Sequence, residues 1–320
     1  MFTNDLYCEI NLLQNIQKSH YEKLCAPNHP SGILLCQKHT NSYRWRKRDM
    51  QENRLITTSI YKSDQALAQN LAVNLYHIIC IQNLQMQINS IDNLLRSRQT
   101  GNQHLELPDA SAAQLPFYAL FRGLRHHPLV PADFFDPHSP YRPFILSYLQ
   151  EEYAWLIEWY LADYKKNPDH PEHLIFPVRL GYNVRSKSEV IIADRLYEEG
   201  ILFHYEEQLL FTDHDCYPDF TIPVTCYEQY AWEHFGAMDN TYYYNRTRGK
   251  ILDFLDHQRL PGINMITTYE TKKHPLTIDH VNQKIRWLKR LYRLSFPDLP
   301  PDNSFNMYDL ASHFQNQRSR

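Results

Sequence analysis

The chain has 320 residues, a formal net charge of −3 at pH 7 and only 8 glycines. No two glycines are closer than 13 positions. This spacing excludes the glycine-dense phosphate loops of dinucleotide-binding folds, P-loop NTPases and kinases, and the nucleophile elbow of α/β-hydrolases. Hydrophobic residues make up 43% of the chain, enough for a sizeable core. The near-neutral charge also excludes a protein that is basic throughout, so a polyanion would have to bind local patches.

The cysteines and apolar segments predict a cytoplasmic protein with reduced thiols. The six cysteines include no C-x-x-C pair, and the first basic residue is Lys18, so no secretory leader is expected. No apolar run approaches the roughly 18 residues of a membrane span, and we expect no membrane association. Cys25-x₃-His29 and Cys36-x₂-His39 have metal-ligand residue types without the spacing of a zinc finger.

Hydrophobic spacing predicts a mostly helical N-terminal half that carries a short β-hairpin. Residues 5–25 match a helix, and apolar and β-branched runs within 32–62 match short strands. Residues 63–97 have the strongest periodicity, an amphipathic helix with a Leu/Ile stripe. We interpret that stripe as core, with a homodimer seam as the alternative. A Pro-rich connector over 100–143 and a Tyr- and Trp-rich helix over 144–166 follow.

The second half alternates helices and strands. Residues 186–199 predict a helix that ends at Gly200. The elements expected after it are strands at 202–211, 217–224 and 228–235, a helix at 239–258, a strand at 263–269 and a helix at 278–294. We therefore expect a helical domain for substrate or partner recognition (1–170), an α/β domain (171–294) and a flexible tail (295–320).

Three acidic residues in the second half are candidate metal ligands. Asp219 begins a predicted strand, and Glu233 lies fourteen residues later, near the end of the next one. Because strand side chains alternate, a hairpin can bring both carboxylates to the same end of the sheet. Glu189, in the first turn of the preceding helix, supplies a third. Converging carboxylates repel unless a cation joins them, and Mg²⁺ takes one or two carboxylates plus waters and phosphate oxygens. Such a site activates water and clamps a transferring phosphate.

Three strings of residues carry a resemblance to a known superfamily. Arg185-Ser186-Lys187-Ser188-Glu189, Pro218-Asp219 and Trp232-Glu233-His234-Phe235-Gly236, in this order of elements, resemble the PD-(D/E)XK, or restriction-endonuclease-like, nucleases. The resemblance implies an α/β fold with a C-terminal αβββαβ core. It also implies a Mg²⁺-dependent endonuclease, with Mn²⁺ as a substitute, that hydrolyses the phosphodiester bonds of nucleic acid, DNA more than RNA. In that family pattern Asp219 and Glu233 would hold the metal, and Glu189 a second ion or its waters.

The third string departs from the family pattern, which places a lysine two residues after the glutamate. That position is Phe235 here, and the alternation points His234 to the opposite face. Some members supply the lysine from the following helix, where Lys250 is the best candidate; Lys187 is the competitor. Loss of the lysine leaves open a catalytically degenerate module of the same fold that binds nucleic acid or a protein.

Each of these residues also has an ordinary structural interpretation. Ser186-x-x-Glu189 matches a capping box. Pro218-Asp219 is common in turns. Glu233 and Lys250 could simply be solvated at the end of a strand and on a helix. The register of the three carboxylates favours the metal site over these alternatives.

Basic residues form two further patterns. Tyr43 to Arg48 interleaves aromatic rings with positive charges, which suits either nucleic-acid contacts or a solvated hairpin face. The last predicted helix carries a basic stripe, four of its members at i, i+3, i+4 and i+7. The candidate phosphate contacts are Arg185, Lys284, Arg286, Lys289, Arg290 and Arg293.

Overall fold

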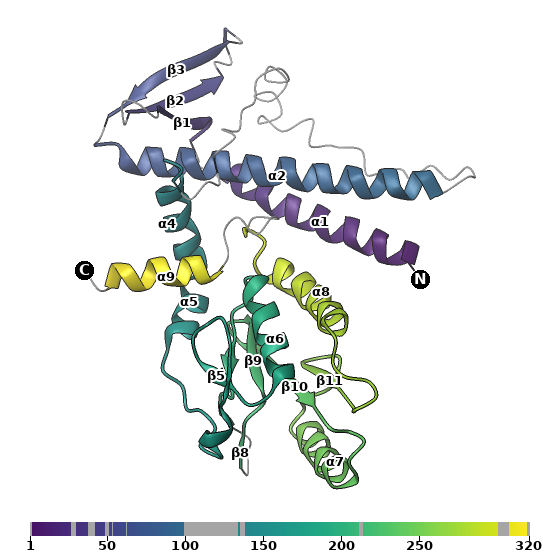
Figure 1. The fold of residues 1–320 in the computed structure, drawn as a ribbon. Helices are drawn as coiled ribbons and strands as arrows, with labels where there is room; N and C mark the ends of the chain where they lie inside the picture. The colour runs from purple at the N-terminus through teal and green to yellow at the C-terminus, as the bar shows by residue number, and fades with distance from the viewer. Residues whose placement is uncertain are drawn as a thin grey trace. The chain divides into compact units, whose positions relative to one another are not determined.

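The structure is a computed structural model that describes residues 2–26, 30–37, 42–48, 51–52, 54–61, 63–98, 134, 138–210, 214–299 and 307–318. The chain divides into two compact units, Met1–Glu152 with Pro297–Phe305 and Tyr153–Phe296 with Asn306–Arg320 (Figure 1). We expected the boundary between the two domains near residue 170, at the end of the N-terminal domain. It lies earlier because the helix expected over 144–166 is interrupted at Tyr153, whose ψ of 26° is not helical. The two pieces are α4 (Arg142–Glu152) and α5 (Ala154–Leu161).

The first unit combines long helices with a small antiparallel sheet. The helices are α1 (Phe2–Leu24), α2 (Gln65–Arg98) and α4; the strands are β1 (Ile33–Gln37), β2 (Ser42–Arg48) and β3 (Leu55–Ile60). The strand order is β1-β2-β3. The unit therefore has three strands where we expected a hairpin, because Ser42–Arg48 pairs along its length with both neighbours.

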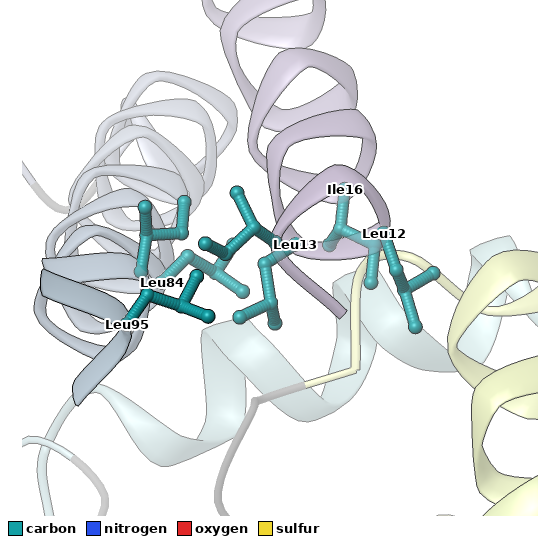
Figure 2. Close-up of a cluster of buried hydrophobic side chains, with 7 residues drawn as sticks. Leu12, Leu13, Ile16, Leu84 and Leu95 are labelled. Atoms are coloured by element: carbon teal, nitrogen blue, oxygen red, sulfur yellow. The ribbon is translucent and has the colours of Figure 1, made fainter. Parts of the chain in front are cut away.

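The Leu/Ile stripe of α2 is part of the core of this unit. Leu84 and Leu95 of α2 pack against Leu13 and Ile16 of α1, and all four side chains are buried (Figure 2). Burying a Leu or Ile side chain contributes about 1.5–3 kcal/mol. Because α1 covers this stripe, the stripe makes an intramolecular contact, as the core interpretation predicts.

The second unit is built on one mixed sheet. Its strands are β6 (His204–Tyr205), β9 (Phe220–Thr225), β10 (Glu228–Phe235) and β11 (Met265–Tyr269). Their order is β11-β10-β9-β6; β10 is parallel to β11, and the other pairs are antiparallel. The strand expected over 202–211 is split, because Glu206 has a left-handed φ of 51°. Beyond it, β7 (Leu209–Leu210) pairs with β8 (Asp215–Cys216) instead.

Helices cover both faces of this sheet. Ala231 and Phe235 of β10 pack against Phe254 of α7 (Thr241–Asp256). On the opposite face, the ring of Tyr230 lies 5.6 Å from that of Trp287 in α8 (Ile278–Ser295). The helix α6 (Lys187–Glu198) packs beside α8. The protein is therefore mixed α/β, with a helical N-terminal region.

The C-terminal segment differs from the flexible tail expected over 295–320. Residues Met307–Arg318 form α9, whose side chains Met307 and Leu310 are completely buried. The hydroxyl of Tyr308 donates to the carbonyl of Ile201 at 2.9 Å. Apolar residues spaced three apart give this polar segment one face that packs within the second unit, which is why it forms a helix.

Other sequence expectations have mixed outcomes. Within the described ranges, no helix has the length and hydropathy needed to cross a bilayer. All six cysteines are free thiols. Most of the Pro-rich connector over 100–143, and both His29 and His39, lie outside the described residues. Three short elements, η2 (Pro171–His173), β4 (Phe176–Pro177) and β5 (Asn183–Val184), precede α6.

Candidate metal centre

Asp219 and Glu233 lie side by side at one end of the mixed sheet. Phe220 of β9 is paired with Trp232 of β10, and this antiparallel register brings the two acidic residues together. The backbone N–H of Asp219 donates to Oε2 of Glu233 at 3.3 Å, and the N–H of His234 donates to Oδ2 of Asp219 at 2.7 Å. Each strand thus holds the carboxylate of the other, which fixes both side chains at this end of the sheet.

Lys250 reaches this carboxylate pair from α7. Its ammonium donates a hydrogen bond to Oε1 of Glu233. The helix begins at Asn240, whose side chain accepts from two backbone N–H groups of the first turn and so caps it. Phe254 anchors α7 to the sheet, and the Lys250 ammonium lies 5.8 Å from the centroid of that ring. The lysine stem therefore runs along apolar surface while its charged end meets the carboxylates.

Glu189 approaches from the start of α6 and is buried. Its Oε2 accepts from the hydroxyl of Tyr205 at 2.6 Å and from the backbone N–H of Arg185 at 3.0 Å. Ser186 is the N-cap and accepts from the N–H of Glu189 at 3.1 Å. The expected cap therefore forms on the serine side, whereas the glutamate bonds one residue earlier than in a capping box.

The three carboxylates interact electrostatically without forming a single three-ligand set. The charge of Glu189 contributes to raising the pKa of both Asp219 and Glu233. Among the residues that the structure describes, the triads whose donor atoms all lie within 4.8 Å of one another do not include these three. Asp219 and Glu233 are thus the pair that could bind one ion directly. Glu189, tied to Tyr205, could reach such an ion through a water molecule.

The electrostatics of the site favour an added cation. Burial, followed by the charges of Glu233 and Glu189, raises the pKa of Asp219 well above its usual range. Burial also raises the pKa of Glu233, against the opposing effect of Lys250. Although burial alone would lower the pKa of Lys250, Glu233 and Asp219 raise it above its usual value. The single ammonium of Lys250 therefore does not offset the cost of ionising the carboxylates. A divalent ion would stabilise their ionised form.

The donor set itself fits a hard divalent ion. Oxygen ligands from one or two carboxylates, completed by water, are what Mg²⁺ takes in phosphate-handling sites. Oδ2 of Asp219 has a backbone donor, and none of the described residues donates to its Oδ1. Oδ1 of Asp219, the residue directly before β9, is therefore available to an incoming cation.

Two other candidate residues lie apart from this group or are already engaged. Lys187 is exposed in the first turn of α6, and no ion pair or hydrogen bond of its side chain is found in the described part of the chain. Arg185 forms a bidentate ion pair with Glu206, with N···O distances of 2.5 and 3.0 Å. Its guanidinium also donates to the carbonyls of Asp169 and His170. Its donors are therefore used within the chain, which disfavours the phosphate contact that we expected of it.

The basic stripe of α8 is only partly available to a ligand. The ammonium of Lys289 bonds to the carboxylate of Glu199. Arg293 is half-buried. The exposed members of the stripe are Lys284, Arg286 and Arg290. These three exposed residues are the candidate phosphate contacts that the fold leaves at the surface.

The site includes two tyrosines that the sequence analysis missed. Tyr205 orients Glu189 through its hydroxyl, and burial, followed by the charges of Asp219 and Glu233, raises the pKa of Tyr243. No spacing rule connects a tyrosine in a two-residue strand with the start of a helix, so no sequence pattern could have found Tyr205. His234, by contrast, points to the other face as alternation predicts, with Nδ1 3.0 Å from Oγ1 of Thr268.

Comparison with known proteins gives no relative: no family model, no curated protein and no solved structure matches this chain. The resemblance carried by the three sequence strings therefore has no independent counterpart.

Proposed function

We propose that this protein is a divalent-metal-dependent nuclease that hydrolyses phosphodiester bonds of nucleic acid, DNA in preference to RNA. The observation that carries the proposal is the contact between the Lys250 ammonium and Glu233, beside Asp219. Two carboxylates and a lysine at one end of a sheet have the composition needed to bind Mg²⁺ or Mn²⁺ and to stabilise charge on a phosphate. The motif strings support the same assignment.

In this proposal the metal ligands are Asp219 and Glu233. A bound divalent ion supplies an activated water and neutralises charge on the phosphate. The raised pKa of Lys250 keeps its ammonium protonated. Lys250 therefore acts by stabilising negative charge on the phosphate oxygens and not as a general base. Tyr205 holds Glu189 where its carboxylate can orient water molecules around the site.

Substrate binding is assigned to local positive charge, since the whole chain carries a net charge of −3. The exposed Lys284, Arg286 and Arg290 of α8 supply cations in the same unit as the carboxylates. Phosphate contacts of this kind position a nucleic acid without selecting its sequence. This arrangement supports a nuclease in which affinity depends on the backbone and on salt concentration.

The test is a cleavage assay on labelled single- and double-stranded DNA and RNA, with Mg²⁺, with Mn²⁺ and with a chelator. We expect the wild type to cleave only with a divalent ion and Asp219→Asn to be inactive. Asp215→Asn is the matched control, because Asp215 is exposed and pairs with Lys165 at 3.2 Å. Equal cleavage by Asp219→Asn and the wild type at saturating Mg²⁺ would overturn the assignment. Binding without cleavage by the wild type would establish the non-catalytic module instead.

A further inference from the structure

A second cluster of ligand-type side chains lies inside the first unit. It joins His20 of α1, His77 of α2 and Asp298, which follows α8, and all three residues are buried. The Nδ1 atoms of His20 and His77 are 2.8 Å apart, and Nδ1 of His20 is 3.8 Å from Oδ1 of Asp298. One donor atom from each residue lies within 4.8 Å of the other two. Three distant parts of the chain thus place three metal-ligating groups around one point.

The two imidazole rings are in a state suited to metal binding. A neutral imidazole has one N–H and one bare nitrogen, so the contact between the two Nδ1 atoms requires opposite tautomers. A metal ion bound by both Nδ1 atoms would take the place of the proton between them, which would move to Nε2 of the same ring.

Neighbouring side chains fix the orientation of Asp298. Its Oδ2 accepts from the hydroxyl of Tyr148 at 2.8 Å and from the ammonium of Lys23. The hydroxyl of Tyr76 donates to the backbone carbonyl of Asp298. These contacts direct Oδ1 towards His20, in the way that outer hydrogen bonds orient metal-bound carboxylates.

The local charge also accommodates a cation. The Lys23 ammonium lies 2.7 Å from Oε1 of Glu152 while it contacts Asp298. Two carboxylates therefore share one ammonium, so these three side chains together keep one formal negative charge. A dication placed at Oδ1 would meet that charge on the side of the carboxylate away from Lys23.

We propose that His20, His77 and Asp298 form a binding site for a zinc-type transition-metal ion that fastens the segment after α8 to α1 and α2. Two imidazole nitrogens and one carboxylate oxygen are a ligand set that Zn²⁺ takes, with a fourth position for water. Zn–N bonds of about 2.0–2.1 Å separate tetrahedral nitrogens by about 3.3 Å, so the observed spacing needs only a small adjustment. Mg²⁺ prefers all-oxygen ligands, which distinguishes this cluster from Asp219 and Glu233.

Two other triads in the described chain have less support. Both include exposed residues, whereas the cluster of His20 is fully enclosed. They are His170, Glu172 and His173, and His214, Asp253 and His257. His173 therefore provides a control position of the same residue type at the surface.

The experiment titrates metal-free protein with Zn²⁺ alone, in the Asp219→Asn background so that the carboxylate pair of the nuclease site is disabled. Native mass spectrometry gives the stoichiometry and thermal unfolding gives the stabilisation. We expect one ion per chain and a raised thermal midpoint. The His77→Gln change should weaken zinc binding at least about 100-fold, and His173→Gln should leave it unchanged. Zinc uptake that survives His77→Gln, or zinc that fails to stabilise the protein, would overturn the proposal.

A second measurement keeps the test valid if His77→Gln does not fold. Cobalt bound to the same Asp219→Asn protein reports its ligands through visible absorption. We expect the bands of a nitrogen- and oxygen-ligated ion without thiolate charge-transfer absorption. Thiolate bands would assign the metal to cysteines such as Cys25 or Cys36 and would contradict the site at His20.

Discussion

Lys250 and Glu233 are joined by a hydrogen bond between a helix and a strand, 17 positions apart in the chain. Phe235, two residues after Glu233, lies on the same face of β10 and packs with Phe254 of α7. An apolar residue at this place therefore holds the helix against the sheet, and the helix in turn carries the lysine to the carboxylate. The apolar residue at position 235 and the position of Lys250 thus have one physical explanation.

We predict that Lys250→Met depresses turnover at least 100-fold, which corresponds to about 3 kcal/mol of transition-state stabilisation. The reason is loss of the ammonium beside the scissile phosphate, so DNA binding should change little. Steady-state cleavage kinetics and a binding titration measure the two quantities. Lys187→Met is the control and should retain near-full turnover, because Lys187 is exposed. If Lys187→Met is inactive and Lys250→Met active, the role passes to Lys187. Two active variants would show that no lysine assists the reaction.

Asp219→Asn should leave the thermal midpoint of the metal-free protein unchanged or raise it. In the native state, burial and the charges of Glu233 and Glu189 oppose the ionisation of this carboxylate. Removing the charge therefore relieves repulsion while an amide keeps the shape and the hydrogen-bond acceptor. Differential scanning calorimetry in a chelator measures the effect, with Asp215→Asn as the exposed control. A clearly lowered midpoint for Asp219→Asn alone would contradict the repulsion argument.

The raised pKa of Asp219 also predicts a dependence of stability on pH. Between the ordinary pKa of an unfolded aspartate and the raised pKa in the fold, the native state binds more protons than the unfolded state. The free energy of unfolding of the wild type should therefore fall as pH rises through this window. We expect the advantage of Asp219→Asn over the wild type, measured in a chelator, to grow with pH and then level off above the folded pKa. Added Mg²⁺ should reduce this stability advantage at the high-pH end of the window. A stability difference that does not depend on pH would argue against a raised pKa of Asp219.

Arg185→Ala should destabilise the protein by about 3–5 kcal/mol, as expected when one partner of a buried ion pair is removed. The side chain of Arg185 is 19% exposed and that of Glu206 is 7% exposed, so the remaining carboxylate would be left buried without its partner. Urea denaturation measures the change. Arg179→Ala is a suitable control, because Arg179 pairs with Glu198 at the surface. Full stability of Arg185→Ala would return this residue to the set of candidate phosphate contacts.

Arg286→Ala should weaken DNA binding without changing stability. Arg286 is exposed on α8, so a contact with a phosphate would add to affinity whatever the DNA sequence. Each phosphate contact removed should reduce the slope of log K against log salt by about 0.9 for duplex DNA. Fluorescence anisotropy over a salt series measures this slope. An unchanged slope for Arg286→Ala together with Lys284→Ala would place the nucleic-acid contact on another surface.

Local sequence patterns predicted most of the elements of the fold. The 3.6-residue pattern of the 63–97 helix corresponds to α2, and Ser186 and Gly200 bracket α6. Such patterns are local, because they reflect which side of an element is buried. The prediction of a flexible tail over 295–320 was wrong for the same reason. Its apolar residues are few, and only the surface on which α9 packs shows that they are enough.

By itself, the sequence determined the alternation of helices and strands and placed Asp219 and Glu233 near the ends of adjacent strands. Strand pairing follows from side-chain alternation, which is a short-range property. Only the tertiary structure decided that Arg185 is held by Glu206, that Lys250 and not Lys187 contacts a carboxylate, and that Tyr205 binds Glu189. It also brought His20, His77 and Asp298 to one point. These contacts join residues far apart in the chain, and their geometry depends on how whole elements pack, which no local pattern encodes.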